Sequence, residues 1–244
     1  MSGLTIRQVP AARGAAWIAG GWQLFASSWG QWVLFFLVLA LLNVVVGALP
    51  RLTVGGFGLA LGQLATSFLT PVFLGGLYLA ARDQQEAGNK PKVGDLFQGF
   101  SGNPELLIWG GIGLILSLLG SLTAFIVAGP APVLNLNDPA VLEQYLLYTQ
   151  SSLPVALIFG LITGLAYWFG IPASALDKVP ALSALAFSYR AGFYNVGALL
   201  LYGVLAALIL LVGILALGLG LLVALPLGLL ANYSAYRDVA GLTS

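Results

Sequence analysis

Two amide side chains, those of Asn43 and Gln63, fall near the middle of long apolar stretches of the sequence. Hydroxyl residues accompany them in the neighbouring apolar stretches, at Thr66, Ser67, Thr70, Ser117, Ser121 and Thr163. Amides and hydroxyls donate and accept hydrogen bonds without carrying a charge. This set predicts either hydrogen bonds between packed helices or the lining of a cavity for an uncharged molecule. The first interpretation is favoured, because short hydroxyls also bond to their own backbone and because Gly58-xxx-Gly62 and Gly160-xxx-Gly164 have the spacing of closely packed helices.

A second recurring feature is the dipeptide Arg-Asp, which occurs twice, each time with the aspartate twelve residues after a proline. The two copies are Pro71 with Arg82 and Asp83, and Pro226 with Arg237 and Asp238. An arginine at the C-terminal end of a helix complements the helix dipole and reaches lipid phosphates, while the aspartate can pair with a neighbouring helix. Both pairs are therefore interpreted as interfacial anchors rather than as parts of a shared active site.

Three further residues are candidate anchors at a membrane surface. Trp17 and Trp22 belong to a cluster of aromatic residues near the N-terminus, and tryptophan rings prefer the headgroup region of a bilayer. Arg190 stands near the end of an amphipathic segment, from which its side chain can extend toward phosphate.

Reactive side chains are scarce in this sequence. It contains no cysteine and no histidine, which excludes disulfides, thiolate and imidazole metal sites, and Cys/His or Ser/His catalytic pairs. All eight acidic residues fall in predicted loops or at predicted helix ends, which disfavours a proton-coupled transporter. We therefore expect no catalytic residue, no metal ligand and no cofactor, and a protein that is not an enzyme.

The composition is that of a protein embedded in lipid. Hydrophobic residues make up 59% of the 244 residues and charged residues only 7%, whereas an ordinary soluble domain has roughly 25% charged residues. Membrane lipids are thus the expected surroundings. The net charge of +1 gives no reason to expect nucleic acid as a partner.

Six stretches reach the length of about 20 apolar residues that a membrane-spanning helix needs. They run from about Gln31 to Leu49, Phe57 to Ala81, Glu105 to Ala128, Leu153 to Ser174, Val196 to Gly213 and Leu215 to Tyr233. The last two form one uncharged run that would make a helix of roughly 57 Å, so a turn is expected near Gly213, Gly218 and Gly220. The predicted fold is an all-α integral membrane protein with six transmembrane helices arranged as three helical hairpins.

The basic residues predict an orientation for these spans. If the N-terminus is cytoplasmic, eight of the nine lysines and arginines lie on that side, and only Arg51 lies on the other. The positive-inside rule then places both termini in the cytoplasm. In the longest loop on the opposite side, Asp138 and Pro139 predict the start of a short helix lying on the outer face.

Each predicted hairpin follows an amphipathic segment, called an elbow segment below: residues 11–27, 93–100 and 180–192. In each, an aromatic residue stands six positions before an amide, as in Phe25 and Gln31, Phe97 and Asn103, and Tyr189 and Asn195. The repeat predicts a single membrane domain of three units, about residues 10–83, 91–177 and 180–238. We expect each elbow segment to form a helix along the cytoplasmic interface.

Several motifs together point to one family. They are Arg7 to Ile18 (RQVPAARGAAWI), Thr70 to Tyr78 (TPVFLGGLY), Val93 to Phe100 (VGDLFQGF), Ser188 to Ala191 with Asn195, and Tyr236 to Asp238. They resemble a family of uncharacterised proteobacterial six-helix inner-membrane proteins, which is similar to the membrane domain fused to some glycerophosphoryl diester phosphodiesterases. The resemblance implies a bacterial inner (cytoplasmic) membrane and the six-helix plan. It implies no catalytic residue, and no phosphodiesterase activity is expected, since the hydrolase domain of the fused relatives has no counterpart here.

Two functions agree with these features. The favoured one is a non-enzymatic membrane protein that interacts with lipids or partners, as a scaffold, a subunit of a larger inner-membrane complex, or a homo-oligomer. The alternative is a transporter or channel for a small neutral or amphiphilic solute that passes near Asn43 and Gln63. A continuous polar cavity between the hairpins would favour this alternative, and a dry, well-packed centre would exclude it.

Overall fold

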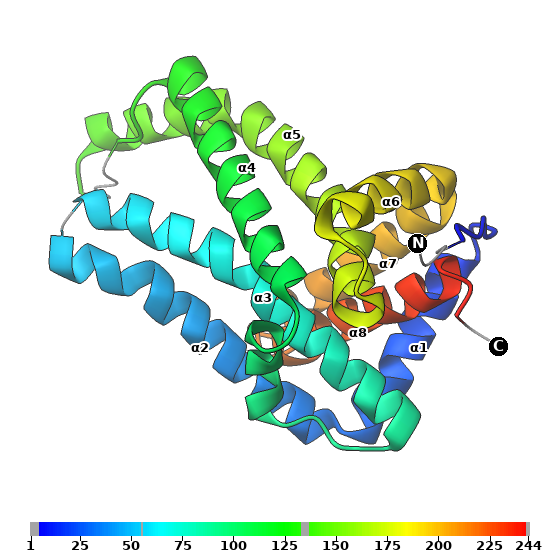
Figure 1. The fold of residues 1–244 in the computed structure, drawn as a ribbon. Coiled ribbons are helices and arrows are strands. Elements are labelled where there is room, and N and C mark those ends of the chain that lie inside the picture. The colour runs from blue at the N-terminus through cyan, green and yellow to red at the C-terminus, as the bar shows by residue number, and fades with distance from the viewer. Residues whose placement is uncertain (1–4, 55, 133–136, 243–244) are drawn as a thin grey trace.

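The computed structural model describes residues 5–54, 56–132 and 137–242, and every regular element within these ranges is a helix (Figure 1). The elements are α1 (Arg13–Ser27), α2 (Trp29–Val54), α3 (Gly56–Ala87), the 3₁₀ helix η1 (Val93–Phe100), α4 (Pro104–Ala128), α5 (Pro139–Asp177), α6 (Ala181–Tyr194), α7 (Val196–Leu215) and α8 (Leu221–Val239). The predicted all-α class is thus confirmed.

Five helices of the described ranges, α2, α3, α4, α5 and α7, are long and apolar enough to cross a bilayer. The sixth predicted span corresponds to α8, a 19-residue helix that does not reach this threshold of apolar composition. Its second half carries Asn232, Arg237 and Asp238, so a window of transmembrane length includes polar residues. That α8 also crosses the membrane stays a prediction.

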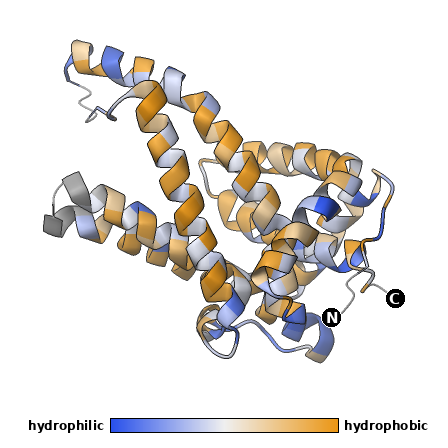
Figure 2. Ribbon diagram, turned by 45° about the horizontal axis from the view of Figure 1, so that its top comes forward, coloured by the Kyte–Doolittle hydropathy of each residue, from blue (hydrophilic) through white to orange (hydrophobic). Residues whose placement is uncertain are grey.

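The helices differ in how much of their surface the protein itself covers. Only 6% of the apolar window of α4 and 11% of that of α2 are buried, against 50% for α3. Large apolar side chains are exposed along α2, α4 and α7, and Figure 2 shows long helices that are mostly hydrophobic. In water such faces would be costly, so lipid is their natural neighbour. Helix α3 forms the centre of the bundle.

Helices occupy all three elbow segments, as α1, η1 and α6. Each packs on the second hairpin helix of another unit: η1 on α3, α6 on α5, and α1 on α8. The contact of α1 with α8 brings the first predicted unit against the last, so the three predicted units are in contact in a closed order. We call the hub the region formed by α1, η1, α6 and the last turns of α3, α5 and α8, from which the hairpins α2–α3 and α4–α5 diverge in Figure 1. That the elbow helices lie along a membrane interface stays a prediction.

The predicted short helix after Asp138 is wrong in its extent. Asp138 does cap the helix, accepting a hydrogen bond from the backbone N–H of Ala140 at 3.0 Å, and Pro139 is its first residue. The helix then continues for 39 residues, through Pro154 and Pro172, to Asp177. A proline removes one backbone hydrogen bond, but in membrane helices neighbouring groups can satisfy the freed carbonyl and the helix need not end.

The turn between the last two helices is where the glycines predicted it, at residues 216–220. Gly218 has a φ of 78°, a left-handed conformation that favours glycine. The backbones of Gly213 and Gly220 lie so close that a Cβ atom at Gly220 would overlap the Cα of Gly213. This prediction is confirmed.

Candidate functional site

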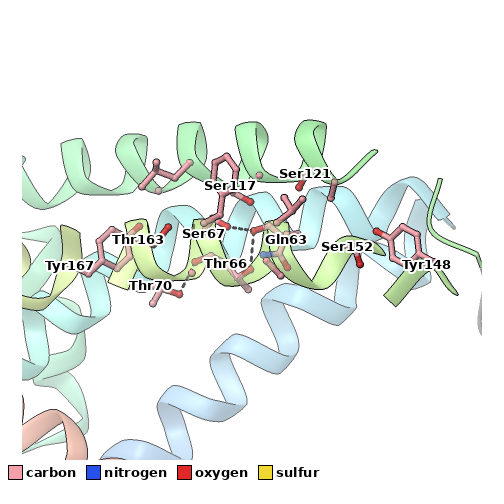
Figure 3. Close-up of a pocket in the computed structure, with 18 residues that line it drawn as sticks. Gln63, Thr66, Ser67, Thr70, Ser117, Ser121, Tyr148, Ser152, Thr163 and Tyr167 are labelled. Carbon is pink, nitrogen blue, oxygen red and sulfur yellow. Dashed lines mark hydrogen bonds between the residues drawn. The ribbon is translucent and has the colours of Figure 1, made fainter. Parts of the chain in front are cut away.

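A cleft of about 620 Å³, lined by both polar and apolar side chains, lies between α3, α4 and α5 (Figure 3). Ten of its lining residues carry uncharged polar groups: Gln63, Thr66, Ser67, Thr70, Ser117, Ser121, Tyr148, Ser152, Thr163 and Tyr167. No lysine, arginine, aspartate or glutamate lines it within the described part of the chain. The hydroxyl residues singled out in the sequence thus come together from three helices, on one shared surface.

Glycines leave the space for this cleft. Gly160 lies on its α5 wall, and an added Cβ there would meet nothing within 4 Å. Gly62 behaves differently, because the carbonyl oxygen of Gly47 on α2 occupies the position where its Cβ would be. The predicted packing role of these spacings therefore holds at Gly62, whereas Gly160 widens a cavity.

The hydroxyls of α3 donate to their own helix. Thr66 Oγ1 bonds to the carbonyls of Gly62 and Gln63, Ser67 Oγ to that of Gln63 at 2.7 Å, and Thr70 Oγ1 to that of Thr66 at 2.7 Å. The hydrogen of each of these hydroxyls is already engaged in a hydrogen bond, but the oxygen retains lone pairs that can accept another. This wall of the cleft therefore presents acceptors.

Other lining groups carry no hydrogen bond to the described residues. They include the side-chain amide of Gln63 and the hydroxyls of Ser117 and Thr163. An amide offers two N–H donors and one carbonyl acceptor, and a hydroxyl offers one donor. The cleft can therefore both donate to a bound molecule and accept from it.

The two amides predicted as a pair are separated by the fold. Gln63 lines the cleft. Asn43 lies on α2 outside it, donates to the carbonyl of Leu39 at 2.9 Å, and accepts a long contact of 3.5 Å from Thr70 Oγ1. Asn43 thus makes its hydrogen bonds within the protein, whereas the side-chain amide of Gln63 has no such bond and lines the cleft.

Asp238, a predicted anchor, is buried within the hub with 1% of its side chain exposed. Its Oδ2 accepts from Arg13 Nε at 2.6 Å and from Trp17 Nε1 at 2.9 Å, and Arg7 Nη1 lies 3.8 Å from Oδ1. The expected pairing of an Asp with a neighbouring elbow helix is therefore present. Trp17 is only 1% exposed, so its indole ring contacts other protein groups rather than lipid. Trp22 is half exposed.

The last turns of α3, α5 and α8 are joined in a ring of polar contacts. Arg82 Nη1 donates to the carbonyl of Leu176 at the end of α5. Next around the ring, the Tyr236 hydroxyl of α8 donates to the carboxylate of Asp177. Arg237 Nη1 then returns to α3, 3.1 Å from Glu86 Oε1. The repeated Arg-Asp dipeptide identified Arg82 and Arg237 in the sequence. Tyr236 was not predicted to make a contact of its own.

The remaining predicted anchors lie at the surface. Asp83 is exposed and accepts from the side chain of Asn89. Arg190 is exposed on α6. Among the described residues, no cluster of aspartate and glutamate could hold a metal ion. The cleft between α3, α4 and α5 is therefore the candidate site, because it combines a volume of about 620 Å³ with ten uncharged polar lining residues.

Comparisons with protein-family models, with curated proteins and with solved structures found no match for this chain. What the cleft binds therefore has to follow from its own shape and chemistry.

Proposed function

We propose that this chain is a non-catalytic, multi-pass membrane protein that binds an uncharged amphiphile in the cleft between α3, α4 and α5. The observation that carries the proposal is a cleft of about 620 Å³ with ten uncharged polar lining residues, placed between helices that are otherwise apolar. A polar cavity between hairpins is the feature that favours solute binding over a purely structural role.

An uncharged head group follows from the lining. An ion that enters the cleft loses its water shell without meeting an opposite charge, which costs far more than moving a hydroxyl or amide. A head group with hydroxyls or amides instead finds acceptors at Thr66 and Ser67 and donors at Gln63.

The amphiphilic character follows from the rest of the wall. Leu116, Val155 and Phe159 also line the cleft, so a ligand with apolar atoms gains by covering them. A wholly polar molecule would place its polar groups against these apolar side chains and would gain nothing from covering them. A lipid-derived molecule that enters from the bilayer satisfies both parts of the wall.

Transport of the same class of molecule is a second candidate, and the length of the cleft favours it. Its lining on α5 extends from Tyr148 to Tyr167. This corresponds to about 28 Å of helix, close to the roughly 30 Å thickness of a hydrocarbon core. A molecule that travels along the cleft would meet polar groups over most of the crossing.

Mass spectrometry of molecules that co-purify in mild detergent tests the binding. Gly160→Leu places a side chain into the cleft, at a position where the structure leaves open space. Gly203→Leu is the matched control, since Gly203 also has nothing within 4 Å but lies on α7, away from the cleft. We expect an amphiphile with an uncharged head in the wild type and in Gly203→Leu, and its loss in Gly160→Leu.

Two results would contradict the proposal. One is a wild-type protein without a bound small molecule, or with the same set of molecules in Gly160→Leu. The other is an occupant with an ionic head group that Gly160→Leu displaces. Circular dichroism and gel filtration of the variants separate loss of ligand from loss of fold.

A further inference from the structure

A second cavity, of about 300 Å³, lies between α3, α5, α7 and α8. Its wall is largely apolar and includes Leu74, Trp168, Ala206, Leu210 and Leu227. On α3 these residues follow the polar ones of the cleft by one turn, toward the hub. The second cavity therefore continues the α3–α5 interface beyond the end of the cleft.

Two tyrosine hydroxyls in this wall are already bonded within the protein, whereas the buried indole N–H of Trp168 has no hydrogen-bond partner among the described residues. The hydroxyl of Tyr78 donates to Asn232 Oδ1 at 3.0 Å, and that of Tyr202 donates to the carbonyl of Gly228 at 2.8 Å. A polar guest thus finds few partners, while an apolar guest gains from every contact. The chemistry of this cavity suits a hydrocarbon.

Tyr167 lines both cavities. Its hydroxyl lies against Gly113 in the wall of the cleft, where an added Cβ would overlap it. Its ring packs edge-on against Trp109, with the ring centroids 5.7 Å apart. Along α5, Thr163 faces the cleft and the next residue, Gly164, lines the second cavity, so the two spaces are neighbours.

We infer that the second cavity holds the hydrocarbon chain of the amphiphile whose uncharged head lies in the cleft. This inference rests on the proposed function and specifies its ligand. An apolar cavity of roughly 150 Å³ admits one benzene molecule, so one of twice that volume admits a chain of about twelve carbons. The ligand class is therefore a single-chain amphiphile of medium length, such as a monoacylglycerol, rather than a lipid with two chains.

The chain offers a matched set of variants on one helix. Gly160 lines the cleft and Gly164, one turn further, lines the second cavity, and neither has a neighbour within 4 Å of an added Cβ. Gly160→Leu therefore fills the head-group site, and Gly164→Leu fills the chain site. Gly203→Leu again serves as the control outside both.

Photo-crosslinking in nanodiscs tests the inference with two forms of monolauroylglycerol, one with a diazirine on the glycerol and one with a diazirine at the end of the chain. In the wild type and Gly203→Leu, we expect the first to label the Gln63–Thr70 part of α3 and the second to label the walls near Ala206 and Leu227. Gly164→Leu removes burial of about two methylene groups, so the affinity falls about tenfold and the chain-end labelling is lost.

The outcomes separate the two claims. If the glycerol probe labels the cleft while the chain-end probe labels lipid-facing residues such as Phe125 in wild type, the chain site is refuted and the cleft remains. If neither probe labels the cleft in the wild type, the proposed function fails together with this inference. Equal chain-end labelling of wild type and Gly164→Leu also overturns the chain site.

Discussion

At the scale of single residues, the three aspartates that end the repeat units have different surroundings. Asp83 is exposed beside Asn89, Asp177 accepts from a tyrosine of α8, and Asp238 is buried beside an arginine and a tryptophan of α1. The repeat in the sequence marks equivalent positions along the chain. Burial differs because only the last unit is covered by the first elbow helix.

Asp238 should therefore be the aspartate that matters for stability. Asp238→Leu leaves the indole N–H of Trp17 buried without an acceptor, and we expect a loss of about 2 to 3 kcal/mol in the free energy of unfolding. The ion pair with Arg13 adds little, since 43% of that side chain is exposed. Unfolding in detergent, followed by tryptophan fluorescence, measures the difference.

The matched variant for this comparison is Asp83→Leu. A surface substitution of this kind usually changes stability by no more than about 0.5 kcal/mol. Equal losses for the two variants would show that the buried contacts of Asp238 do not stabilise the fold.

The two amides make a second pair of variants. Asn43→Leu should lower the free energy of unfolding by about 0.6 to 2 kcal/mol and leave ligand binding intact, because Asn43 bonds only within the protein. Gln63→Leu should leave stability nearly unchanged and weaken binding, because its amide faces the cleft. Thermal unfolding and the glycerol-probe labelling of both variants check this, and the reverse assignment would refute the placement of the ligand head.

The sequence identified seven of the ten polar lining residues of the cleft, missed Tyr148, Ser152 and Tyr167, and did not show that Asn43 lies outside it. Mid-span position shows that a residue lies deep in a helix, and it does not show which way the helix is rotated. That rotation depends on packing between distant segments, such as the contact of Gly62 with Gly47. Asn43 and Gln63 therefore looked equivalent in the sequence.

At the scale of elements, the α2–α3 hairpin depends on close approach of its backbones. Gly62→Leu forces a side chain against the backbone of Gly47, and overpacking of this kind costs about 1 to 3 kcal/mol. Gly111→Leu, on α4 with nothing within 4 Å, should cost little. Thermal unfolding of both variants in the same detergent compares their stabilities. If Gly62→Leu were as stable as Gly111→Leu, the close approach of α2 and α3 would not stabilise the fold.

Element boundaries followed the sequence where an apolar run met polar or glycine residues. The turn after α7 was predicted from its glycines, and Asp138 and Pro139 marked the start of α5. The length of α5 was not predicted, because its polar first turns resembled a separate surface helix. Whether two such segments join depends on the packing partners on either side, and a single sequence does not contain them.

At the scale of the whole molecule, the three units close on one another at the hub. A ring of polar contacts joins α3, α5 and α8. It consists of the contacts of Arg82 with Leu176, Tyr236 with Asp177, and Arg237 with Glu86. The sequence predicted three units from local repeats. It could not predict their cyclic order, because each contact of the ring joins residues that are at least 59 positions apart.

This closure has a consequence for topology. The backbone N–H of Arg7 donates to the carbonyl of Val239 at 2.8 Å, and this contact predicts that the two ends of the chain lie on the same side of the membrane. Together with the positive-inside rule, this predicts that both are cytoplasmic. Reporter fusions after Ser244, which lies outside the described residues, and at Ala140 in the first turn of α5 should report opposite compartments. Matching compartments would contradict an even number of spans.

The most direct measurement of the central claim is a density map of the protein in nanodiscs made from its own membrane lipids. The binding proposal predicts an elongated density in the cleft of Figure 3, with its broader end within hydrogen-bonding distance of Gln63 and its tail passing Tyr167 toward Ala206. A cleft that side chains have closed, or that holds only separate water molecules while lipid covers α2, α4 and α7, would contradict it.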